Sequence, residues 1–294
     1  MNRTQTMNRT QTLRALLAGP SALVTPTVYD ALSSRIAVQA GFKAIFVSGF
    51  GIAASRLGMP DTGLISFGEM LDQISGICAA VPGVPVIADA DTGFGNAMNV
   101  RRTVFEYARA GASCIMIEDQ VSPKRCGHFE GKQVVPRDEA RMKIRAAVEA
   151  AREADILVLA RTDARAPDGF DAALARCHDF EQEGADIVFL EAPQSQEELQ
   201  RFVKGVTRPT MANMVAGGRT PMLSPDALSA MGVKLAVYHP LLFSAVKAMQ
   251  DAAAALMRGD LQGGPASCGI DDVKRVVDLP GYEALEKRYA TAPR

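Results

Sequence analysis

Reactive side chains are concentrated in the stretch Lys124–His128, which reads KRCGH. It holds two cations, a thiol, a glycine and one of the 3 histidines of the chain, and it follows an apolar run that ends in Glu118 and Asp119. Loops on a rigid scaffold carry much of a protein's function. The stretch is therefore either an active-site loop, with Lys124, Cys126 and His128 as candidate catalytic groups, or a solvated basic loop with an incidental cysteine.

Three acids at the ends of two expected strands form a candidate metal site. Asp89 and Asp91 are two residues apart, so a strand would point both side chains to the same side, and Glu118 ends the next strand. Hard oxygen ligands suit Mg2+, or alternatively Mn2+, whereas the lack of an accompanying histidine or cysteine argues against zinc. A helix N-cap role would explain one acid, but not all three.

Other polar residues could hold an anionic substrate. Arg161 ends an otherwise apolar run and pairs either with a nearby carboxylate or with a substrate carboxylate, for which its planar fork is suited. Ser48 and Gly49 offer a hydroxyl and backbone N–H groups, a weak signal when taken alone. His239, beside a proline, could touch the substrate, whereas His178 lies in a helical pattern and is expected to be structural.

These residues stand where short apolar runs end, and each run is followed by a helical pattern. The alternation predicts a closed (β/α)8 barrel of the α/β class, with an open doubly wound sheet as the rival that the absence of a Gly-rich dinucleotide turn disfavours. In a barrel the carboxyl ends of all strands meet at one rim, so the candidate side chains are expected together there. The expected strands span residues 22–29, 44–48, 85–90, 114–118, 156–161, 186–191, 210–213 and 234–238.

Composition and charge exclude several classes of function. The chain is 48% hydrophobic and 22% charged, with a formal net charge of −1, so no bulk attraction to nucleic acid or to anionic membranes is expected. It has no apolar run of membrane-spanning length and no signal-peptide core at its start, which predicts a cytoplasmic protein. The 5 cysteines form no CxxC pair, so neither a disulfide framework nor a zinc site is indicated.

The ends of the chain differ from its middle. Residues 1–12 repeat the polar hexapeptide MNRTQT and are expected to be a disordered tail, followed by a short helix over residues 13–19. Residues 13–260 are expected to form the catalytic barrel. Residues 261–294 are expected to form a C-terminal helical extension.

The order of the motifs resembles that of the isocitrate lyase/phosphoenolpyruvate mutase superfamily, over roughly residues 13–260. Within it, the chain is most similar to the branch of methylisocitrate lyase, 2,3-dimethylmalate lyase and petal death protein. The motifs that carry the resemblance are Ser48–Gly49, Leu57–Asp61, Asp89–Gly95, Ile117–Gln120, Lys124–His128, Ala160–Ala164 and Ala212–Met214.

The resemblance implies a barrel whose last helix is swapped between two subunits, with two such dimers forming a homotetramer. It implies that Asp89, Asp91 and Glu118 bind Mg2+, partly through water, and that Asp61 lies on a second mobile loop of the site. Arg161 and Cys126 would be catalytic, together with Lys124 and His128. The residues expected to bind a small carboxylate substrate are Ser48, Gly49, Phe50, Asp61, Gly127, Arg161, Glu191 and Asn213.

The implied reaction is retro-aldol cleavage of a 2-hydroxy di- or tricarboxylate to pyruvate or a related 2-oxo acid and a carboxylic acid. The resemblance makes Cys126 the acid that protonates the pyruvate enolate. Two other reactions stay open: phosphonomutase chemistry, with Lys124, Arg125 and His239 as candidate phosphate-binding groups, and hydrolysis of oxaloacetate. A barrel kept only as a binding scaffold would require a broken site, and here the acids, the arginine and the thiol are all present.

Two segments depart from methylisocitrate lyases and bear on the substrate. Phe129–Lys132 replaces an Arg-Pro-Asn-Lys sequence, and Val215–Gly218 replaces a Thr-Glu-Phe-Gly type of sequence. Some relatives carry an acid at the position of Ala216. The pocket around Phe50, Val215–Gly218 and His239 is therefore expected to decide the substrate.

Overall fold

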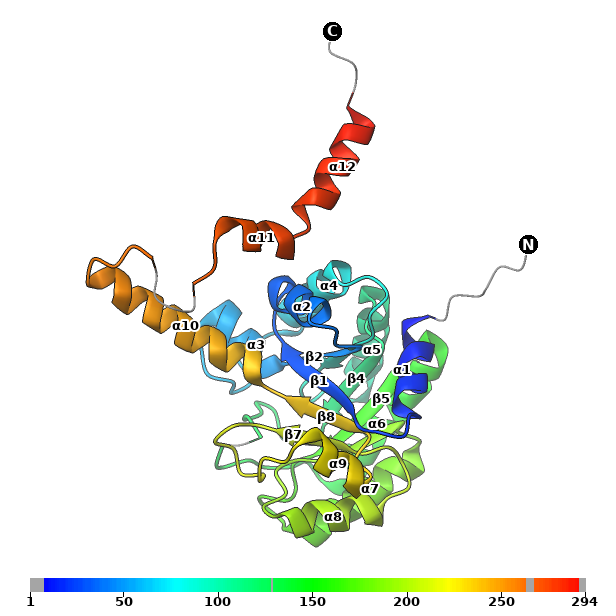
Figure 1. The fold of residues 1–294 in the computed structure, drawn as a ribbon. Helices are drawn as coiled ribbons and strands as arrows, with labels where there is room; N and C mark the ends of the chain where they lie inside the picture. The colour runs from blue at the N-terminus through cyan, green and yellow to red at the C-terminus, as the bar shows by residue number, and fades with distance from the viewer. Residues whose placement is uncertain (1–7, 128, 263–266, 291–294) are drawn as a thin grey trace.

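The computed structural model describes residues 8–127, 129–262 and 267–290 (Figure 1). Eight parallel strands form one sheet in the order β6-β5-β4-β3-β2-β1-β8-β7. A further bridge between Val188 and Thr210 joins β6 to the residue before β7, so the sheet is nearly closed. The strands are β1 (Leu23–Val28), β2 (Ile45–Val47), β3 (Val86–Asp89), β4 (Cys114–Glu118), β5 (Leu157–Thr162), β6 (Ile187–Leu190), β7 (Met211–Met214) and β8 (Leu235–Tyr238).

Helices surround the sheet, as the alternating pattern of the sequence predicted. Sequential strands are neighbours and β1 pairs with β8, which confirms the barrel and rejects the open doubly wound sheet. The helices are α1 (Arg9–Leu17), α2 (Ala31–Gln39), α3 (Gly49–Ile52), the π-helical turn η1 (Ala53–Leu57), α4 (Phe67–Ala80), α5 (Ala97–Ala110), α6 (Arg137–Ala154), α7 (Phe170–Glu183), α8 (Gln196–Gly205), α9 (Pro225–Met231), α10 (Pro240–Met257), α11 (Ile270–Val276) and α12 (Leu279–Tyr289).

The core has two layers because every strand is covered on both faces. Side chains such as Ile87, Leu159 and Leu235 fill the barrel interior, and a second cluster lies between the sheet and the helices. Leu13 and Leu17 of α1 join the interior cluster. The helix α1 therefore covers the amino-terminal end of the barrel and leaves the opposite rim for the site.

The start of α1 corrects one expectation. A helix was predicted from residue 13, but it begins at Arg9, because Asn8 caps it in a reciprocal capping box with Gln11. Residues 9–12 are thus helical, whereas residues 1–7 of the expected tail lie outside the described part. The Arg9 guanidinium also donates to the carbonyl groups of Gly111 and Cys78, which ties α1 to the barrel.

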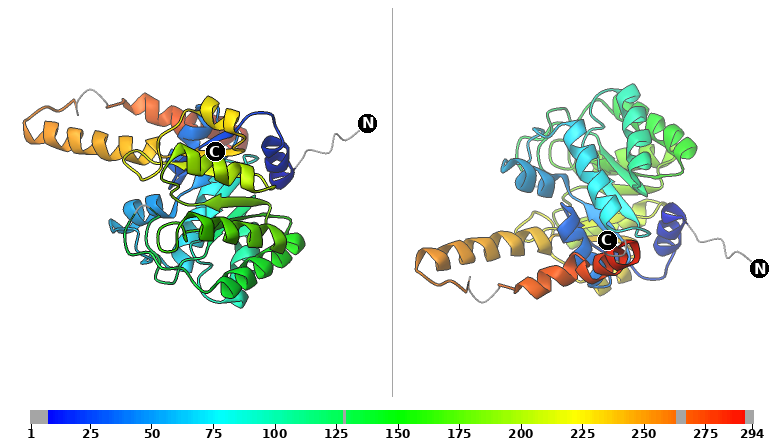
Figure 2. Two further views of the ribbon diagram at one scale, coloured as in Figure 1. Left: turned by 90° about the horizontal axis from the view of Figure 1, so that it is seen from below. Right: turned by 90° about the horizontal axis from the view of Figure 1, so that it is seen from above.

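The helix α10 leaves the barrel and extends away from it, and α11 and α12 follow (Figures 1 and 2). Apolar side chains on this arm are exposed, among them Met249 (64%), Leu256 (61%) and Tyr289 (72%). The arm touches the barrel where the Gln39 amide of α2 donates to the Val276 carbonyl at 3.1 Å. Residues 270–276 and 279–289 are thus helical.

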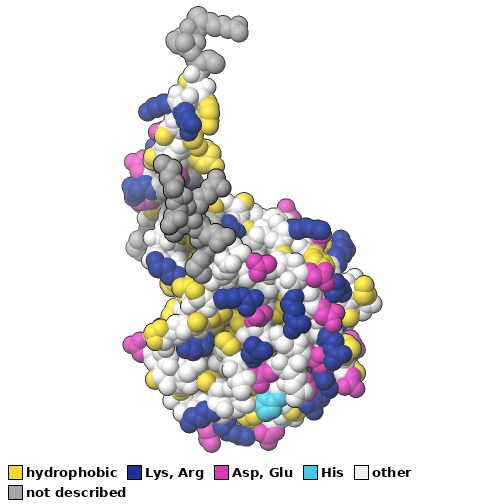
Figure 3. All heavy atoms as spheres, turned by 90° about the vertical axis from the view of Figure 1, so that its right-hand side faces the viewer, with side chains coloured by type: hydrophobic (Ala, Val, Ile, Leu, Met, Phe, Trp, Pro, Cys, Tyr) yellow, Lys and Arg dark blue, Asp and Glu magenta, His cyan; other side chains and the backbone are white. Residues whose placement is uncertain are grey.

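The surface has no single dominant charge on the face shown in Figure 3, where basic and acidic side chains are interspersed. In the part of the chain that the structure describes, no helix combines the length and the apolarity required to span a membrane.

Candidate active site

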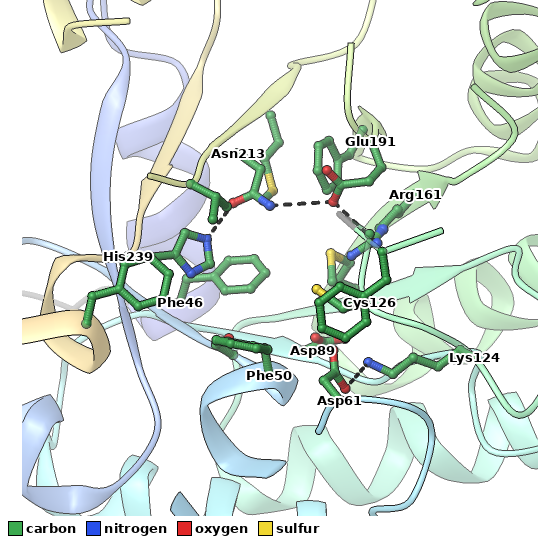
Figure 4. Close-up of a pocket in the computed structure, with 18 residues that line it drawn as sticks. Phe46, Phe50, Asp61, Asp89, Lys124, Cys126, Arg161, Glu191, Asn213 and His239 are labelled. Atoms are coloured by element: carbon green, nitrogen blue, oxygen red, sulfur yellow. Dashed lines mark hydrogen bonds and ion pairs between the residues drawn. The ribbon is translucent and has the colours of Figure 1, made fainter. Parts of the chain in front are cut away.

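The carboxyl ends of six strands, β2, β3 and β5 to β8, deliver polar side chains to one cavity of about 130 Å³ (Figure 4). They do so because each residue lies at or near the end of its strand or follows it directly. The expected residues that line the cavity are Ser48, Phe50, Asp61, Asp89, Lys124, Cys126, Gly127, Arg161, Glu191 and Asn213. Gly49, Asp91 and Glu118 lie beside this group but do not line it, and His128 falls outside the described residues.

A lysine stands among the acids. The Nζ atom of Lys124 lies 2.5 Å from Asp61 Oδ1 and 2.9 Å from Asp91 Oδ1, and all three side chains are buried. Burial alone would lower the pKa of Lys124, but the charges of Asp91 and Asp61 raise it well above its ordinary value. Burial raises the pKa of Asp91 to about 6, although Lys124 opposes this shift. The ammonium group is therefore the cation that this cluster of acids holds in the described structure.

The three expected metal ligands are near one another, but their geometry differs from the expectation. β3 ends at Asp89, and Asp91 lies in a turn with φ of 47°, so the strand argument for a common direction is wrong. The two carboxylates nevertheless converge on Gly49, where an added Cβ would lie 2.9 Å from Asp89 Oδ2 and 3.4 Å from Asp91 Oδ1. Among the described residues, no set of three His, Cys, Asp or Glu side chains is arranged to bind one ion directly. The expected compact three-carboxylate cluster is therefore not formed.

One oxygen atom of these acids still lacks a partner. Glu118 Oε1 is buried and accepts no hydrogen bond from the described residues, whereas Asp91 Oδ1 already pairs with Lys124. Burial also raises the pKa of Glu118 well above its ordinary value, with Arg161 opposing the shift. Buried polar atoms normally have partners, and an unpaired carboxylate oxygen suits a cation such as Mg2+ that keeps several waters. The donor set therefore fits the implied metal when water completes its shell.

Arg161 pairs with acids of the rim. Its Nε and Nη2 atoms donate to the two oxygens of Asp163 at 2.8 and 3.0 Å. Nε also lies 3.3 Å from Glu118 Oε2, and Nη2 lies 3.3 Å from Glu191 Oε2. Of the two alternatives from the sequence, pairing with rim carboxylates is thus observed, while the guanidinium also lines the cavity.

The anion-binding groups after β2 are partly engaged within the protein. The Ser48 hydroxyl accepts from the Gly51 N–H and so caps α3. The Gly49 N–H donates to Asp89 Oδ2 at 3.2 Å. Gly49 therefore orients a carboxylate in this structure, whereas the Ser48 hydroxyl faces the cavity with its own proton available to donate.

The loop that carries Cys126 is held by hydrogen bonds within itself and to the segment of Asp61. We call residues 120–134 the Cys126 loop. The Arg125 N–H donates to the Gln120 side chain, which in turn donates to the Arg125 carbonyl at 2.8 Å. The Cys126 N–H donates to the Asp61 carbonyl at 3.0 Å, so the two expected loops of the site are joined. Cys126 lines the cavity on the same side as Arg161 (Figure 4).

A hydrogen-bonded series crosses the opposite side of the cavity. The Asn213 amide Nδ2 donates to Glu191 Oε2 at 3.5 Å, and its Oδ1 lies 2.6 Å from His239 Nε2 (Figure 4). The other ring nitrogen of His239 lies 3.3 Å from Thr27 Oγ1. Since Asn213 Oδ1 is an acceptor, His239 carries its proton on Nε2 in this arrangement. His239, which the sequence left undecided, therefore belongs to the cavity wall.

Phe129 and Val215, from the two segments expected to bear on the substrate, line the cavity. Sequence reasoning missed Phe243, which also lines it, and the burial of Lys132 within the Cys126 loop. Nothing in the sequence marks Phe243, which lies one turn into α10, and Lys132 carries no signal of burial.

Comparison with known proteins agrees with this geometry. The family model of phosphoenolpyruvate phosphomutase matches residues 13–257. 2,3-Dimethylmalate lyase of Eubacterium barkeri is 42% identical over 289 residues, which are 97% of this chain and 99% of that protein. 2-Methylisocitrate lyase of Aeropyrum pernix is 41% identical over 285 residues, which are 96% of this chain and 90% of that protein.

A solved structure matches over almost its whole length. Oxaloacetate acetylhydrolase in complex with the inhibitor 3,3-difluorooxalacetate gives a TM-score of 0.93 at 34% identity, covering 98% of this chain and 99% of that one. The prediction of a lyase-type enzyme is confirmed by the relatives. The chain belongs to the phosphoenolpyruvate mutase/isocitrate lyase superfamily, as its motifs predicted.

Proposed function

We propose that the protein is a Mg2+-dependent carbon–carbon lyase acting on a 2-hydroxy di- or tricarboxylate of the 2-alkylmalate or methylisocitrate type. The products would be pyruvate or a related 2-oxo acid and a carboxylic acid. The observation that carries the proposal is that a thiol, a guanidinium and buried acids face one cavity, through Cys126, Arg161 and Asp89. The lyases among the relatives support the same class of reaction.

Asp89, Asp91 and Glu118 would hold the metal ion, partly through water. When bound there, Mg2+ supplies positive charge for the oxygen of the substrate that gains negative charge as the carbon–carbon bond breaks. Mn2+ has the same preference for oxygen ligands. Lys124, now between Asp61 and Asp91, would keep the remaining acids neutralised.

Arg161 and Ser48 would bind the carboxylate next to the hydroxyl carbon. The guanidinium offers directed N–H donors and its side chain is only 9% exposed, so hydrogen bonds to it are strong. Asp163 and Glu191 hold the guanidinium in place and so orient it before the substrate arrives.

The movement of electrons during the cleavage decides which carbon atom receives the proton of the Cys126 thiol. The 2-hydroxyl group loses its proton and becomes the carbonyl of the 2-oxo acid, and Asp61, on the cavity wall, would take this proton. The bonding electrons pass to the carbon next to the second carboxylate. The Cys126 thiol then donates its proton to that carbon. The thiol proton therefore goes to a carbon atom of the carboxylic acid that leaves, and not to a pyruvate enolate as the resemblance implied.

The apolar wall favours the lyase over the phosphonomutase. Phe50, Phe129, Val215 and Phe243 give the far side of the cavity a surface suited to alkyl groups. Among the described lining residues, Lys124 and Arg161 are the only lysine and arginine, and both already pair with acids. Arg125, a candidate for binding phosphate, points to a different hollow behind the loop.

We propose that two copies of the chain exchange their α10–α12 arms, and that two such dimers form a homotetramer. The exposed Met249 and Leu256 on α10 support this, as does an apolar groove beside Met222 and Tyr238 that a second copy's arm would cover. Sedimentation of the protein and of the Met249→Glu/Leu256→Glu variant tests it. The variant should shift toward the monomer, and a monomeric unaltered protein at micromolar concentration would refute the exchange.

The reaction itself is tested by incubating the protein with Mg2+ and a panel of 2-alkylmalates, methylisocitrate and oxaloacetate. A pyruvate-coupled assay should show turnover that EDTA abolishes and that the Cys126→Ser variant lacks. Oxalate release from oxaloacetate without pyruvate formation would favour the hydrolase instead. Formation of a new P–C bond on an enolpyruvate precursor, seen as the 31P NMR signal of a phosphonate product, would favour the mutase.

A further inference from the structure

Lys132 is a buried lysine at the base of the Cys126 loop. Its side chain is 1% exposed, although its neighbours Glu130 and Gly131 are exposed. The Nζ atom donates to the Gly127 carbonyl at 2.5 Å and to Asp163 Oδ1 at 2.8 Å. A buried ammonium is unfavourable unless it is paired, so these two acceptors account for its position.

Asp163 connects this lysine to Arg161. The carboxylate is fully buried and accepts two hydrogen bonds from the guanidinium of Arg161, at 2.8 and 3.0 Å, in addition to the one from Lys132. The backbone N–H of Asp163 donates to Asp119 Oδ1 at 2.8 Å, which fixes the backbone at Asp163 itself. The backbone next to Cys126 is therefore joined to Arg161 on β5 through only two side chains, Lys132 and Asp163.

Other polar contacts of the loop reach different segments, such as those of Lys124 with Asp61 and Asp91 and of Glu130 with Arg219. Gly127 also packs directly against Arg161. Gln120 binds both backbone groups of Arg125 within the loop, and the Asp61 carbonyl binds the Cys126 N–H from the loop after η1. These contacts fix the shape of the loop and its position beside Asp61. The contact of Lys132 fixes the position of the loop relative to the strand that carries the guanidinium.

We propose that Lys132 is a positioning residue that sets the Cys126 thiol at a fixed distance from Arg161. It touches neither substrate nor metal; it acts through the Gly127 carbonyl on one side and Asp163 on the other. The inference rests on the proposed function for the roles of Cys126 and Arg161. Because proton donation depends on the placement of the thiol over the reacting carbon, loss of this contact affects turnover more than substrate binding.

The first test measures loop position without any substrate. Iodoacetamide is added to the full-length protein at pH 8, and alkylation of each cysteine is followed by mass spectrometry. Burial raises the pKa of Cys78 to about 11 and raises those of Cys114 and Cys177 well above the ordinary value, so these three thiols stay unreactive. The exposed Cys268 serves as an internal reference.

Three variants separate the roles of charge, donor and stability. Lys132→Met removes both the donor and the charge, Lys132→Gln keeps a donor, and Lys234→Met removes a lysine-to-carbonyl bond, to Gly19, far from the site. In Lys132→Met, alkylation of Cys126 should be about tenfold faster and kcat about 10- to 100-fold lower, with a smaller change in KM. Lys132→Gln should recover part of both effects, and Lys234→Met should show neither.

The outcomes are distinct. Equal Cys126 alkylation and equal kcat in folded Lys132→Met and Lys234→Met would overturn the inference. Faster alkylation in Lys132→Met, together with no turnover of any acid by the unaltered protein, would support the positioning role and reject the proposed function. If Lys132→Met does not fold, Lys132→Gln carries the test, and its alkylation rate has to exceed that of the unaltered protein.

Discussion

Gly127 lies so close to Arg161 that no other residue type fits between the Cys126 loop and β5. A Cβ atom at Gly127 would be 2.5 Å from Arg161 Nη2 and 2.7 Å from the Cγ and Cδ atoms of Glu191. Real Cβ contacts are not this short, so the loop or the guanidinium would have to move. The thiol loop and the strand are thus packed directly against each other.

Gly127→Ala should therefore reduce kcat/KM by about 100-fold, since a displacement of about 1 Å at a reacting group costs this much. The matched control is Gly76→Ala, because nothing lies within 4 Å of a Cβ at this site in α4. That variant should keep full activity and gain up to about 1 kcal/mol of stability. Steady-state kinetics measure kcat/KM of the two variants, and urea unfolding measures their stability. Full activity in Gly127→Ala would contradict the packing argument.

Arg161→Lys should lower kcat/KM by about 10- to 100-fold, because a lysine keeps the charge but loses the planar pair of donors. Arg165→Lys makes the same change in a pair with Glu198 away from the cavity, where Nε and Nη2 donate at 3.0 and 2.7 Å. Kinetics on the accepted substrate should be unchanged in this control. An equal loss in both variants would show that the effect of Arg161 is only structural.

Lys124→Met should make the protein more dependent on Mg2+ for stability. Without the ammonium, Asp61 and Asp91 are buried acids that lack their cation, so thermal unfolding in EDTA should occur at a clearly lower temperature. Saturating Mg2+ stabilises a native state by about 2.7 kcal/mol at 100 times its Kd. The rise in melting temperature should be larger in Lys124→Met than in the unaltered protein; equal rises would mean that the lysine and the metal do not share these acids.

The contribution of Asp163 to stability should depend on pH. Burial alone would raise the pKa of Asp163, but Arg161 and Lys132 lower it well below its ordinary value. A carboxyl with a lowered pKa stabilises the fold fully above its unfolded pKa of about 4, and this contribution is lost as the pH falls through the folded pKa.

Asp163→Asn should therefore lose about 3 kcal/mol or more above about pH 5, because it breaks a buried pair. The difference from the unaltered protein should shrink as the pH falls below about 4. Urea unfolding from neutral to acidic pH measures it, with the exposed Asp168→Asn as the control. A difference that stays constant at low pH would contradict the assignment.

The sequence predicted the parts of the structure that depend on local patterns. Apolar runs and their spacing identified the strands, and the rule that strand ends meet at one rim placed Asp89, Arg161 and Cys126 at one cavity. The start of α1 was missed because the capping pair of Asn8 and Gln11 lies within a repeat that looked like a disordered tail.

Contacts between distant segments could not be predicted in this way. Nothing in the sequence indicates that Lys132 is buried or that it binds Asp163, 31 residues away. The turn at Asp91 and the occupation of its carboxylate by Lys124 likewise depend on how two loops meet. The pairing of His239 with Asn213 joins two neighbouring strands, so only the assembled barrel reveals it.

Part of the apolar wall of the cavity lies outside the sheet. Asp89 and Arg161 are part of the sheet, whereas Phe50, Val215 and Phe243 belong to α3, the segment after β7, and α10. Evolution can therefore replace wall residues and change which acid is accepted without rebuilding the reactive centre or weakening the sheet. Two relatives of nearly equal identity to this chain, 42% and 41%, have names that specify different substrates.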